Sequence, residues 1–305
     1  MTFATAAAPA KSAFGRPENT RLTLWLFLGP CLLYLAIFSI YPLIHSLRLS
    51  FTDLTAATGT GNFIWLENYR ILLFDEQFWN AAKNSAIMVT LAVVVQVVLG
   101  VALAMFFNLQ LRGSWIVRGI LLLPMLMTPI VVGVMWRTLL NPDWGIVDWT
   151  IRAIGLTPPD WLGSVNMAIL TLVLVDSWQW TPFVFIIVFA RLQALPTEVF
   201  EAANVDGAGP FTTFRRITLP MLMPAIVFAG IFRAVDAFRS FDLIYGLSYG
   251  GPARGTTTMA FFAFQNGFQF QNYGYAAAVA YAMLLVLIVG TTLMLRYVQI
   301  RTVRS

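Results

Sequence analysis

Six long apolar runs constrain this chain most, because each is close to the roughly 20 residues that an α-helix needs to cross a bilayer. They cover residues 22–43, 85–107, 116–139, 167–190, 221–243 and 275–295. With 59% hydrophobic and 11% charged residues, the chain has too few charges to cover a soluble globule of 305 residues. The sequence predicts an all-α polytopic membrane protein with six transmembrane helices. Pro124 and Pro129 are expected to kink the third helix, and Pro182 the fourth.

Several classes of protein are excluded by what the sequence lacks. Cys31 is the single cysteine and His45 the single histidine, so neither a disulfide framework nor a metal cluster of these residues forms within the chain. A membrane-embedded enzyme is not expected, since no convincing pair of nucleophile and base is present. The 19 Lys and Arg residues are scattered across loops, which argues against nucleic-acid binding despite the net charge of +5.

The distribution of the basic residues predicts the orientation of the spans. Eleven of the 19 fall on one side of the six runs and six on the other, while Arg233 and Arg239 lie inside the fifth run. Because cytoplasmic loops carry the excess of positive charge, both termini and the loop at residues 196–220 are predicted to be cytoplasmic. Residues 1–20 are expected to form a flexible cytoplasmic tail, and residues 21–305 the transmembrane domain.

The loop at residues 196–220 has the sequence of two short helices. Pro196-Thr197 is a typical helix start, and Gly207 is a typical stop. Pro210 follows a further glycine and suits the first position of a second helix. We therefore expect a compact helix-turn-helix between the fourth and fifth spans.

The same loop carries a longer pattern: Glu201-Ala202-Ala203, three residues, Gly207, nine residues, Ile217, one residue, Leu219-Pro220. Every specified position matches, so the loop resembles the EAA loop of ATP-binding-cassette importer permeases. In that family the first short helix is a coupling helix, which seats in a cleft of a cytoplasmic ATPase subunit and transmits its closure to the membrane. An ordinary surface helix would explain the alanine pair by propensity, but not the glycine and the Ile-x-Leu-Pro end in register.

The residue types of this helix suit such a docking. The alanine pair leaves a face without bulk for close approach, the glutamate orients the helix, and the neighbouring apolar side chains offer anchors to a pocket of the partner. The chain has no Gly-x-x-x-x-Gly-Lys-Ser/Thr loop, so ATP and Mg²⁺ are expected on the partner ATPase, and this chain itself is expected to carry no cofactor and no enzymatic activity. The predicted coupling site consists of Val199, Phe200, Glu201, Ala202, Ala203 and Gly207.

Four charged residues recur at every third position of the fifth run: Arg233, Asp236, Arg239 and Asp242. Charges at membrane depth are costly and rarely face lipid, so these must face a cavity or one another. One interpretation is a self-neutralising ladder that locks the bundle. The other is a polar route whose charges bind a hydroxyl-rich solute through charge-assisted hydrogen bonds. We expect a mixture, with Asp242 nearer the outer end and Arg233 nearer the middle.

Three further stretches resemble the carbohydrate branch of these permeases, the maltose and glycerol-phosphate type. They are Tyr41-Pro42 at the end of the first run, residues 178–183 in the fourth, and residues 232–245 leading to Gly250-Gly251-Pro252. Sugars stack their C–H faces on aromatic rings and need hydrogen-bonding groups for their hydroxyls. Trp178, Gln179 and Trp180 are therefore assigned, with the four charges, to the substrate pathway. Asp148 departs from the family, which often carries asparagine there, and its role is left open.

The resemblance implies a type I importer permease in the bacterial cytoplasmic (inner) membrane. It implies a second permease subunit, two ATPase subunits and an extracytoplasmic solute-binding protein as partners, and solute movement inward by alternating access. A secondary active transporter is the alternative, but it predicts inverted sequence repeats, and no clear repeat is present. The basic residues of the fifth run leave open an anionic sugar, phosphorylated or sulfonated, as the solute.

Overall fold

The computed structural model describes residues 20–109 and 113–303 of a chain that divides into two units after Arg48. These residues are mainly helical, and the β-type pairings among them are two isolated bridges. Five helices are long and apolar enough to cross a membrane, and a bent helix pair in the third run makes a sixth if it counts as one span. This confirms the predicted all-α membrane fold. Of the predicted tail at residues 1–20, only Thr20 belongs to the residues that the structure describes.

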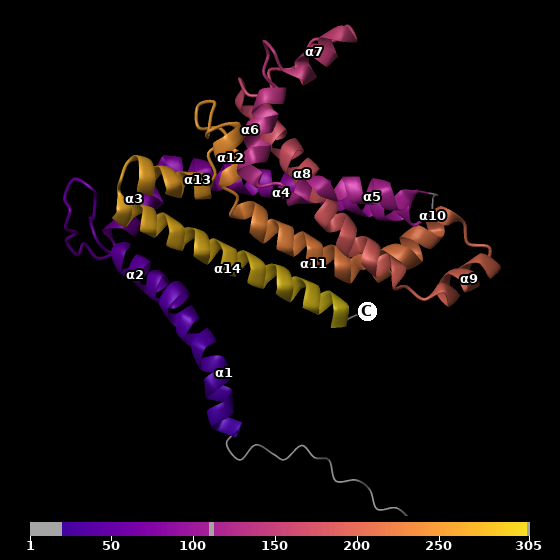
Figure 1. Cartoon of the computed structure of the whole chain (residues 1–305), viewed down its shortest axis with the longest axis horizontal. Coiled ribbons are helices and arrows are strands. Elements are labelled where there is room, and N and C mark those ends of the chain that lie inside the picture. The colour runs from indigo at the N-terminus through magenta and orange to yellow at the C-terminus, as the bar shows by residue number, and fades with distance from the viewer. Residues whose placement is uncertain (1–19, 110–112, 304–305) are drawn as a thin grey trace, which may run out of the picture. The chain divides into compact units, whose positions relative to one another are not determined.

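The first span is a long helix in three parts: α1 (Thr20–Leu35), a π-helical turn η1 (Ala36–Ile40) and α2 (Tyr41–Leu49) (Figure 1). Within Trp25–Leu49, none of the apolar stretch is buried inside the chain. Large side chains such as Phe38, which is 65% exposed, are typical of it. The apolar surface of this span is therefore available to lipid or to another protein.

Three helices form the centre of the second unit: α4 (Glu76–Phe107), α8 (Val165–Gln193) and α11 (Leu219–Phe238) (Figure 1). They pack closely, because a Cβ atom on Gly100 of α4 would lie only 2.7 Å from Cγ1 of Val184 on α8. Apolar clusters extend along both halves of α8. Although Pro182 predicts a kink, α8 continues through it as one unbroken helix. Several polar side chains of α8 are buried in this centre, and among the described residues the hydroxyls of Ser177 and Thr181 have no hydrogen-bond partner.

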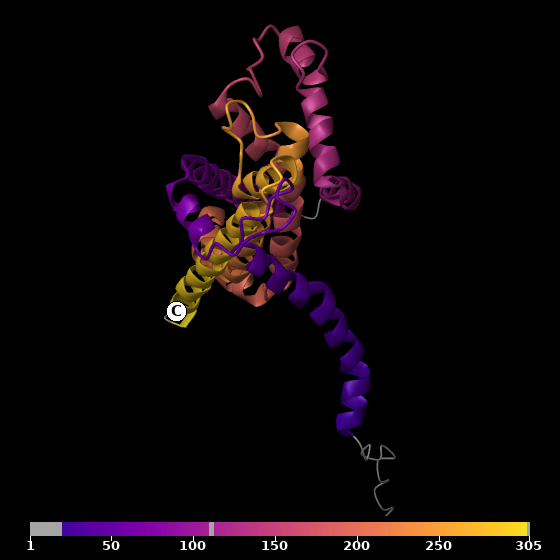
Figure 2. The ribbon, with the colours of Figure 1, turned by 90° about the vertical axis from the view of Figure 1, so that its left-hand side faces the viewer.

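The third run is not one kinked helix, as the sequence predicts, but two helices at 100° to each other. α5 (Ser114–Leu122) and a 3-10 turn η2 (Leu123–Leu126) precede the break, and α6 (Pro129–Leu139) follows it. Thr128 is extended at the break, as the residue before a proline prefers to be. In Figures 1 and 2, α6 extends away from the three central helices. The proline therefore redirects the chain.

Two glycines bring α6 against the short helix α12 (Asp242–Leu247). A Cβ on Gly133 would lie 2.8 Å from the backbone oxygen of Leu243, and one on Gly246 would lie 2.6 Å from that of Ile130. Neither position has room for a side chain. The contact between α6 and α12 is thus one of backbone against backbone.

The fifth span differs from its prediction at both ends. α10 (Pro210–Thr213) passes through a π-helical turn, η3 (Phe214–Thr218), directly into α11, so Pro210–Phe238 is one helical segment of 29 residues. The expected separate second helix of the 196–220 loop is therefore the beginning of the span itself. At the other end α11 stops at Phe238, five residues early, and α12 begins at Asp242.

The segments that connect the spans form short helices near the end of the central bundle where α4 and α8 begin. They are α3 (Glu67–Phe74), α7 (Ile146–Ala153), α13 (Met259–Phe264) with a π-helical turn η4 (Gln265–Gln269), and the start of α14 (Tyr273–Val303). α13 begins at Met259, because the Thr258 side chain caps it by accepting the Phe261 N–H.

Asp148 receives a structural role. Its carboxylate is buried and accepts a hydrogen bond from Nε1 of Trp161 at 2.7 Å, and it lies 3.8 Å from the guanidinium of Arg152. An asparagine could accept the indole hydrogen bond but could not pair with Arg152. The acid thus holds α7 against the loop that leads into α8.

Candidate functional site

α9 (Thr197–Val205) is the predicted coupling helix, and its bounds follow from local backbone chemistry. Pro196 stands at the N-cap in an extended conformation, and Gly207 has φ +72°. The N–H of Gly207 donates to the oxygen of Asn204, and that of Ala208 to the oxygen of Ala203. A side chain at Gly207 would be strained, because left-handed backbone disfavours any Cβ. The predicted start and stop of this helix are confirmed.

The residues predicted to form the coupling site differ in how much of each side chain is exposed on α9. Ala203 is only 5% exposed, and Phe200 packs against the apolar cluster of α4, α8 and α11. Ala203 thus faces its own chain, and Phe200 is half-buried against it, so both help to seat the helix. Their contact with a partner stays a prediction. Glu201 and Ala202 are exposed as expected, and Val199 is half-buried.

Two exposed apolar side chains beside α9 were missed by sequence reasoning. Val205 is 88% exposed, and Phe211, at the start of the next helix, is 73% exposed. Helical spacing identifies the first, since Val205 lies four residues after Glu201 and three after Ala202 and so shares their face. Glu201, Ala202 and Val205 share an exposed face of α9, and Phe211 is exposed at the start of α10; we call these four residues the docking edge.

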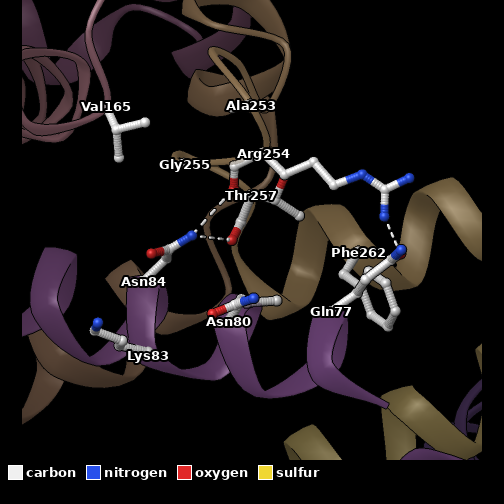
Figure 3. Close-up of a pocket in the computed structure, with 11 residues that line it drawn as sticks. Gln77, Asn80, Lys83, Asn84, Val165, Ala253, Arg254, Gly255, Thr257 and Phe262 are labelled. Atoms are coloured by element: carbon white, nitrogen blue, oxygen red, sulfur yellow. Dashed lines mark hydrogen bonds between the residues drawn. The ribbon is translucent and has the colours of Figure 1, made fainter.

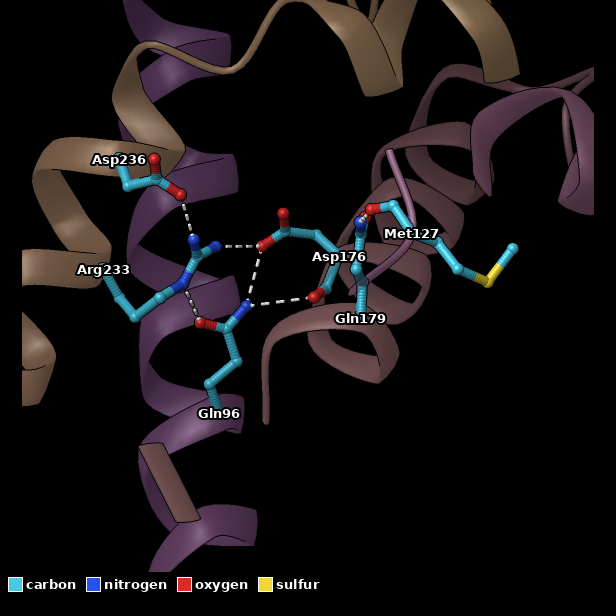
Figure 4. A network of polar contacts seen from close by, with 6 residues as sticks. All are labelled: Gln96, Met127, Asp176, Gln179, Arg233 and Asp236. Carbon is cyan, nitrogen blue, oxygen red and sulfur yellow. Dashed lines mark hydrogen bonds and ion pairs between the residues drawn. The ribbon is translucent and has the colours of Figure 1, made fainter. Parts of the chain in front are cut away.

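A second polar site lies where the three central helices meet (Figure 4). Arg233 of α11 is 1% exposed, and its guanidinium donates to Oδ2 of Asp176 on α8 at 3.0 Å and to Oε1 of Gln96 on α4 at 2.9 Å. It also pairs with Asp236 one turn further along α11, and it lies over the ring of Trp180 at 4.6 Å from the centroid. This charge network joins side chains from all three central helices.

Gln96 closes the network. Its amide nitrogen donates to Oδ2 of Asp176 at 2.7 Å, while its amide oxygen accepts from Arg233. Arg233, Asp176, Asp236 and Gln96 are thus joined by four side-chain hydrogen bonds. Because Arg233 and Asp176 are buried, removal of either one leaves an uncompensated charge. In the described conformation, Arg233 and Asp176 hold the helices together and are closed to solute.

The four-charge ladder is therefore not one structure. Its first two members, Arg233 and Asp236, form the expected i,i+3 pair. Arg239 and Asp242 lie beyond the end of α11, are exposed, and have no ion pair within the described residues. Arg239 contributes the positive charge at one end of an apolar groove between α11 and α14. Solute contact, as a prediction, stays with the exposed members.

The three predicted pathway residues of α8, Trp178, Gln179 and Trp180, also point to different surroundings. Trp178 is 38% exposed and meets Trp136 of α6 edge to face at 5.5 Å, while Trp180 turns toward Arg233. Gln179 is fully buried, and its amide donates at 2.9 Å to the backbone oxygen of Met127, at the break of the third span. These three residues do not form one sugar-binding surface. Gln179 instead satisfies a carbonyl that the broken helix leaves free.

The comparisons with known proteins agree with this architecture. The family described as "Binding-protein-dependent transport system inner membrane component" matches residues 96–304. The trehalose/maltose transport system permease protein MalF of Thermococcus litoralis is 32% identical, over 84% of this chain and 86% of the relative. The sulfoquinovosyl glycerol transport system permease protein SmoG of Agrobacterium fabrum is also 32% identical, over 92% and 91%.

A solved structure shows that the fold is shared. A chain of the bacterial ABC transporter for import of the acidic polysaccharide alginate superposes with a TM-score of 0.80 at 23% identity, covering 90% of this chain and 94% of the other. The family match extends over more than half of the sequence and includes α8, α9 and α11. The chain thus belongs to the family of inner membrane components of binding-protein-dependent transport systems.

Proposed function

We propose that this chain is the permease subunit of an ATP-driven importer of a sugar or sugar derivative. It works with a second permease subunit, two ATPase subunits and an extracytoplasmic solute-binding protein, and moves solute inward by alternating access. ATP and Mg²⁺ belong to the ATPase subunits, and both termini of this chain face the cytoplasm. The excess of basic residues on the α9 side of the sequence supports this orientation.

The observation that carries the proposal is the placement of α9. The helix presents the docking edge outward while Phe200 and Ala203 fix it to the chain. It stands directly between α8 and the 29-residue segment that contains α11. Because Arg233 and Asp176 join those same two helices, a force applied to α9 by an ATPase reaches the charge network through two covalent connections.

The relatives support a sugar as the solute. Their names include transport of trehalose and maltose, of lactose in Rhizobium radiobacter, and of sn-glycerol 3-phosphate in Agrobacterium fabrum. The alginate transporter has also been solved in complex with a periplasmic protein carrying an alginate pentasaccharide, and that chain superposes with a TM-score of 0.78. This supports a binding protein as the partner on the outer side.

An anionic sugar is the second candidate, and one residue favours it. Arg239 is an exposed cation near the outer end of the fifth span, with no ion pair among the residues that the structure describes. Arg233, in contrast, is neutralised by Asp176 and Asp236 and adds no free positive charge. The SmoG relative, named for a sulfonated sugar derivative, supports this candidate. Arg239→Gln should then impair uptake of sugar phosphates or sulfonates more than uptake of neutral disaccharides.

The test of the importer function is a pair of substitutions on the docking edge. Glu201→Lys and Val205→Ser, in the full complex reconstituted in vesicles, should each lower ATP-dependent uptake about tenfold or more, because interface anchors dominate binding energy. Labelled trehalose, maltose, lactose and glycerol 3-phosphate serve as the solute panel. ATPase activity stimulated by the binding protein is measured in parallel.

Ile71→Ser provides the matched control, since Ile71 is an exposed β-branched residue on α3, far along the chain from α9. It should leave uptake unchanged. Equal uptake in wild type and both docking-edge variants would exclude α9 as the coupling helix. Uptake that persists without the ATPase subunit would favour a secondary transporter instead.

A further inference from the structure

A cavity of about 300 Å³ lies between the first turns of α4, the loop at residues 253–257 and the start of α8 (Figure 3). Its lining includes polar side chains of α4 and the loop together with apolar residues and a glycine. The residues around it are Gln77, Asn80, Ala81, Lys83, Asn84, Val165, Ala253, Arg254, Gly255, Thr257 and Phe262. We call it the α4 pocket.

The α4 pocket carries positive charge without compensation. Lys83 and Arg254 line it, and no Asp or Glu does. Within the described residues neither cation has an ion pair, and the guanidinium of Arg254 donates to the neutral amide oxygen of Gln77. The two cations stand at opposite sides of the cavity (Figure 3), and a cavity lined by cations without an acid favours an anionic group as its occupant.

The wall that carries Arg254 is held in place. The amide nitrogen of Asn84 donates to the backbone oxygen of Arg254 at 3.2 Å and to that of Thr257 at 3.1 Å, so α4 grips the loop directly. Ala253 and Arg254 both have positive φ, +46° and +62°, conformations that persist only where the surroundings impose them. Figure 3 shows the side chain of Arg254 reaching across toward Gln77. The cavity is thus a formed site.

The pocket lies at the end of the bundle away from α9. α4 and α8 run in parallel, because Asn84 and Val165 line one cavity near their first turns, while Asn108 and Gln193 are hydrogen-bonded at 2.7 Å beside their last. α9 follows Gln193 after three residues. If α9 meets a cytoplasmic ATPase, as the proposed function has it, the α4 pocket faces the extracytoplasmic side.

We propose that the α4 pocket receives the carboxylate of an acidic side chain on the solute-binding protein, an inference that rests on the proposed function. Its volume is at the lower end of the range for small-molecule sites and suits one side chain better than a sugar. A lipid headgroup is less well matched, because the apolar residues Ala81 and Phe262 are buried and offer no surface to acyl chains.

A zero-length cross-link tests the chemistry of the occupant. A water-soluble carbodiimide condenses a lysine amine with a carboxylate in direct contact, so the assembled complex with its binding protein should yield a peptide joining Lys83 to an Asp or Glu of that protein. Lys83→Arg is the matched control, because it keeps the charge but cannot form this amide. It should lose the cross-link and keep wild-type affinity. A complex that forms normally without any cross-link at Lys83 would overturn the proposal.

The affinity of the binding protein for the complex in nanodiscs gives a second, independent readout. Lys83→Gln and Arg254→Gln should each weaken it about three- to fivefold at 0.15 M salt, the upper range for exposed ion pairs, and less at 0.5 M salt. Arg70→Gln, which removes a 74% exposed cation of α3 paired only with Glu67, should change nothing. Unchanged affinity in the double variant would sink the proposal.

The outcomes separate this inference from the function on which it rests. If the binding protein fails to bind the wild-type complex at all, the importer assignment fails, and the α4 pocket proposal falls with it. If the wild type binds and the pocket variants bind equally well, only the pocket proposal fails. An effect of Lys83→Gln that appears in vesicles of anionic lipid, and is absent in phosphatidylcholine, would assign the pocket to a headgroup phosphate and contradict the proposal.

Discussion

The first and fourth spans look alike as sequence but differ in how much of each is buried within its own unit. Both are long apolar helices, yet none of the apolar stretch of the first span is buried within the chain, whereas 61% of that of α8 is buried. The difference lies in their polar residues. α8 carries Asp176, Ser177, Gln179 and Thr181, all buried, and the described part of the first span carries no acid. Polar residues within an apolar run thus mark the helix that protein surrounds.

The largest expected effect comes from the charge network of the buried span. Arg233→Ala should lower the yield of monodisperse permease at least tenfold, because removal of one partner from a buried ion pair costs about 3–5 kcal/mol. Gel filtration of the detergent-solubilised complex measures the yield. The double substitution Arg233→Met with Asp176→Leu should recover most of it, since it removes both charges. A normal yield for Arg233→Ala alone would mean that these helices are held together by other contacts.

Two phenylalanines compare the spans directly. Phe185 of α8 is 2% exposed, and Phe38 of the first span is 65% exposed. Phe185→Ala should destabilise the subunit by about 3–4 kcal/mol, the usual range for a buried aromatic, and Phe38→Ala by under about 0.5 kcal/mol. Thermal denaturation of the purified permease subunit measures both. If Phe38 packs against the second permease subunit, its loss should lower the yield of the heterodimer instead. Equal destabilisation by the two variants would contradict the difference in burial between Phe185 and Phe38.

The smallest expected effect concerns two glycines. Gly100→Ala should destabilise the subunit by about 1–3 kcal/mol, because its Cβ would meet Val184 and the overpacked contact must open. Gly29 in the first span has no atom within 4 Å of a Cβ position, so Gly29→Ala should be neutral or slightly stabilising through helix propensity. The same thermal assay applies. A loss of stability in Gly29→Ala would show that the first span is tightly covered by protein.

Local rules predicted what depends on neighbours in sequence. The start of α9 at Pro196 and its stop at Gly207 follow from backbone preferences of single residues, and the Arg233–Asp236 pair follows from helical spacing. The long apolar runs likewise predicted the spans, since length and hydropathy suffice for that. The bounds of α9 could therefore be predicted from the sequence alone.

The interior of the bundle could not be predicted in this way. Arg233 is 137 residues from Gln96 and 57 from Asp176, and nothing in the sequence couples these positions. Its burial therefore became known only from the packing. The same holds for Phe200, whose residue type suits a partner pocket and which packs, half-buried, against the apolar cluster of its own chain. The two prolines of the third run predicted a bend near Thr128. The angle between α5 and α6, however, depends on how α6 packs against α12, which is distant in sequence.

The unbroken helical segment from Pro210 to Phe238 has a mechanical consequence. Its 29 residues, at about 1.5 Å per residue, make a rod roughly 44 Å long, with one end beside α9 and Arg233 close to the other. Tilting such a rod by about 10° around one end sweeps the other through about 8 Å, which is more than one helical pitch. If an ATPase acts on the docking edge, as we propose, a small rotation imposed there is amplified at the depth of the charge network. The π-helical turn at Phe214–Thr218, where the winding changes, is the natural place for that rotation to be absorbed or passed on.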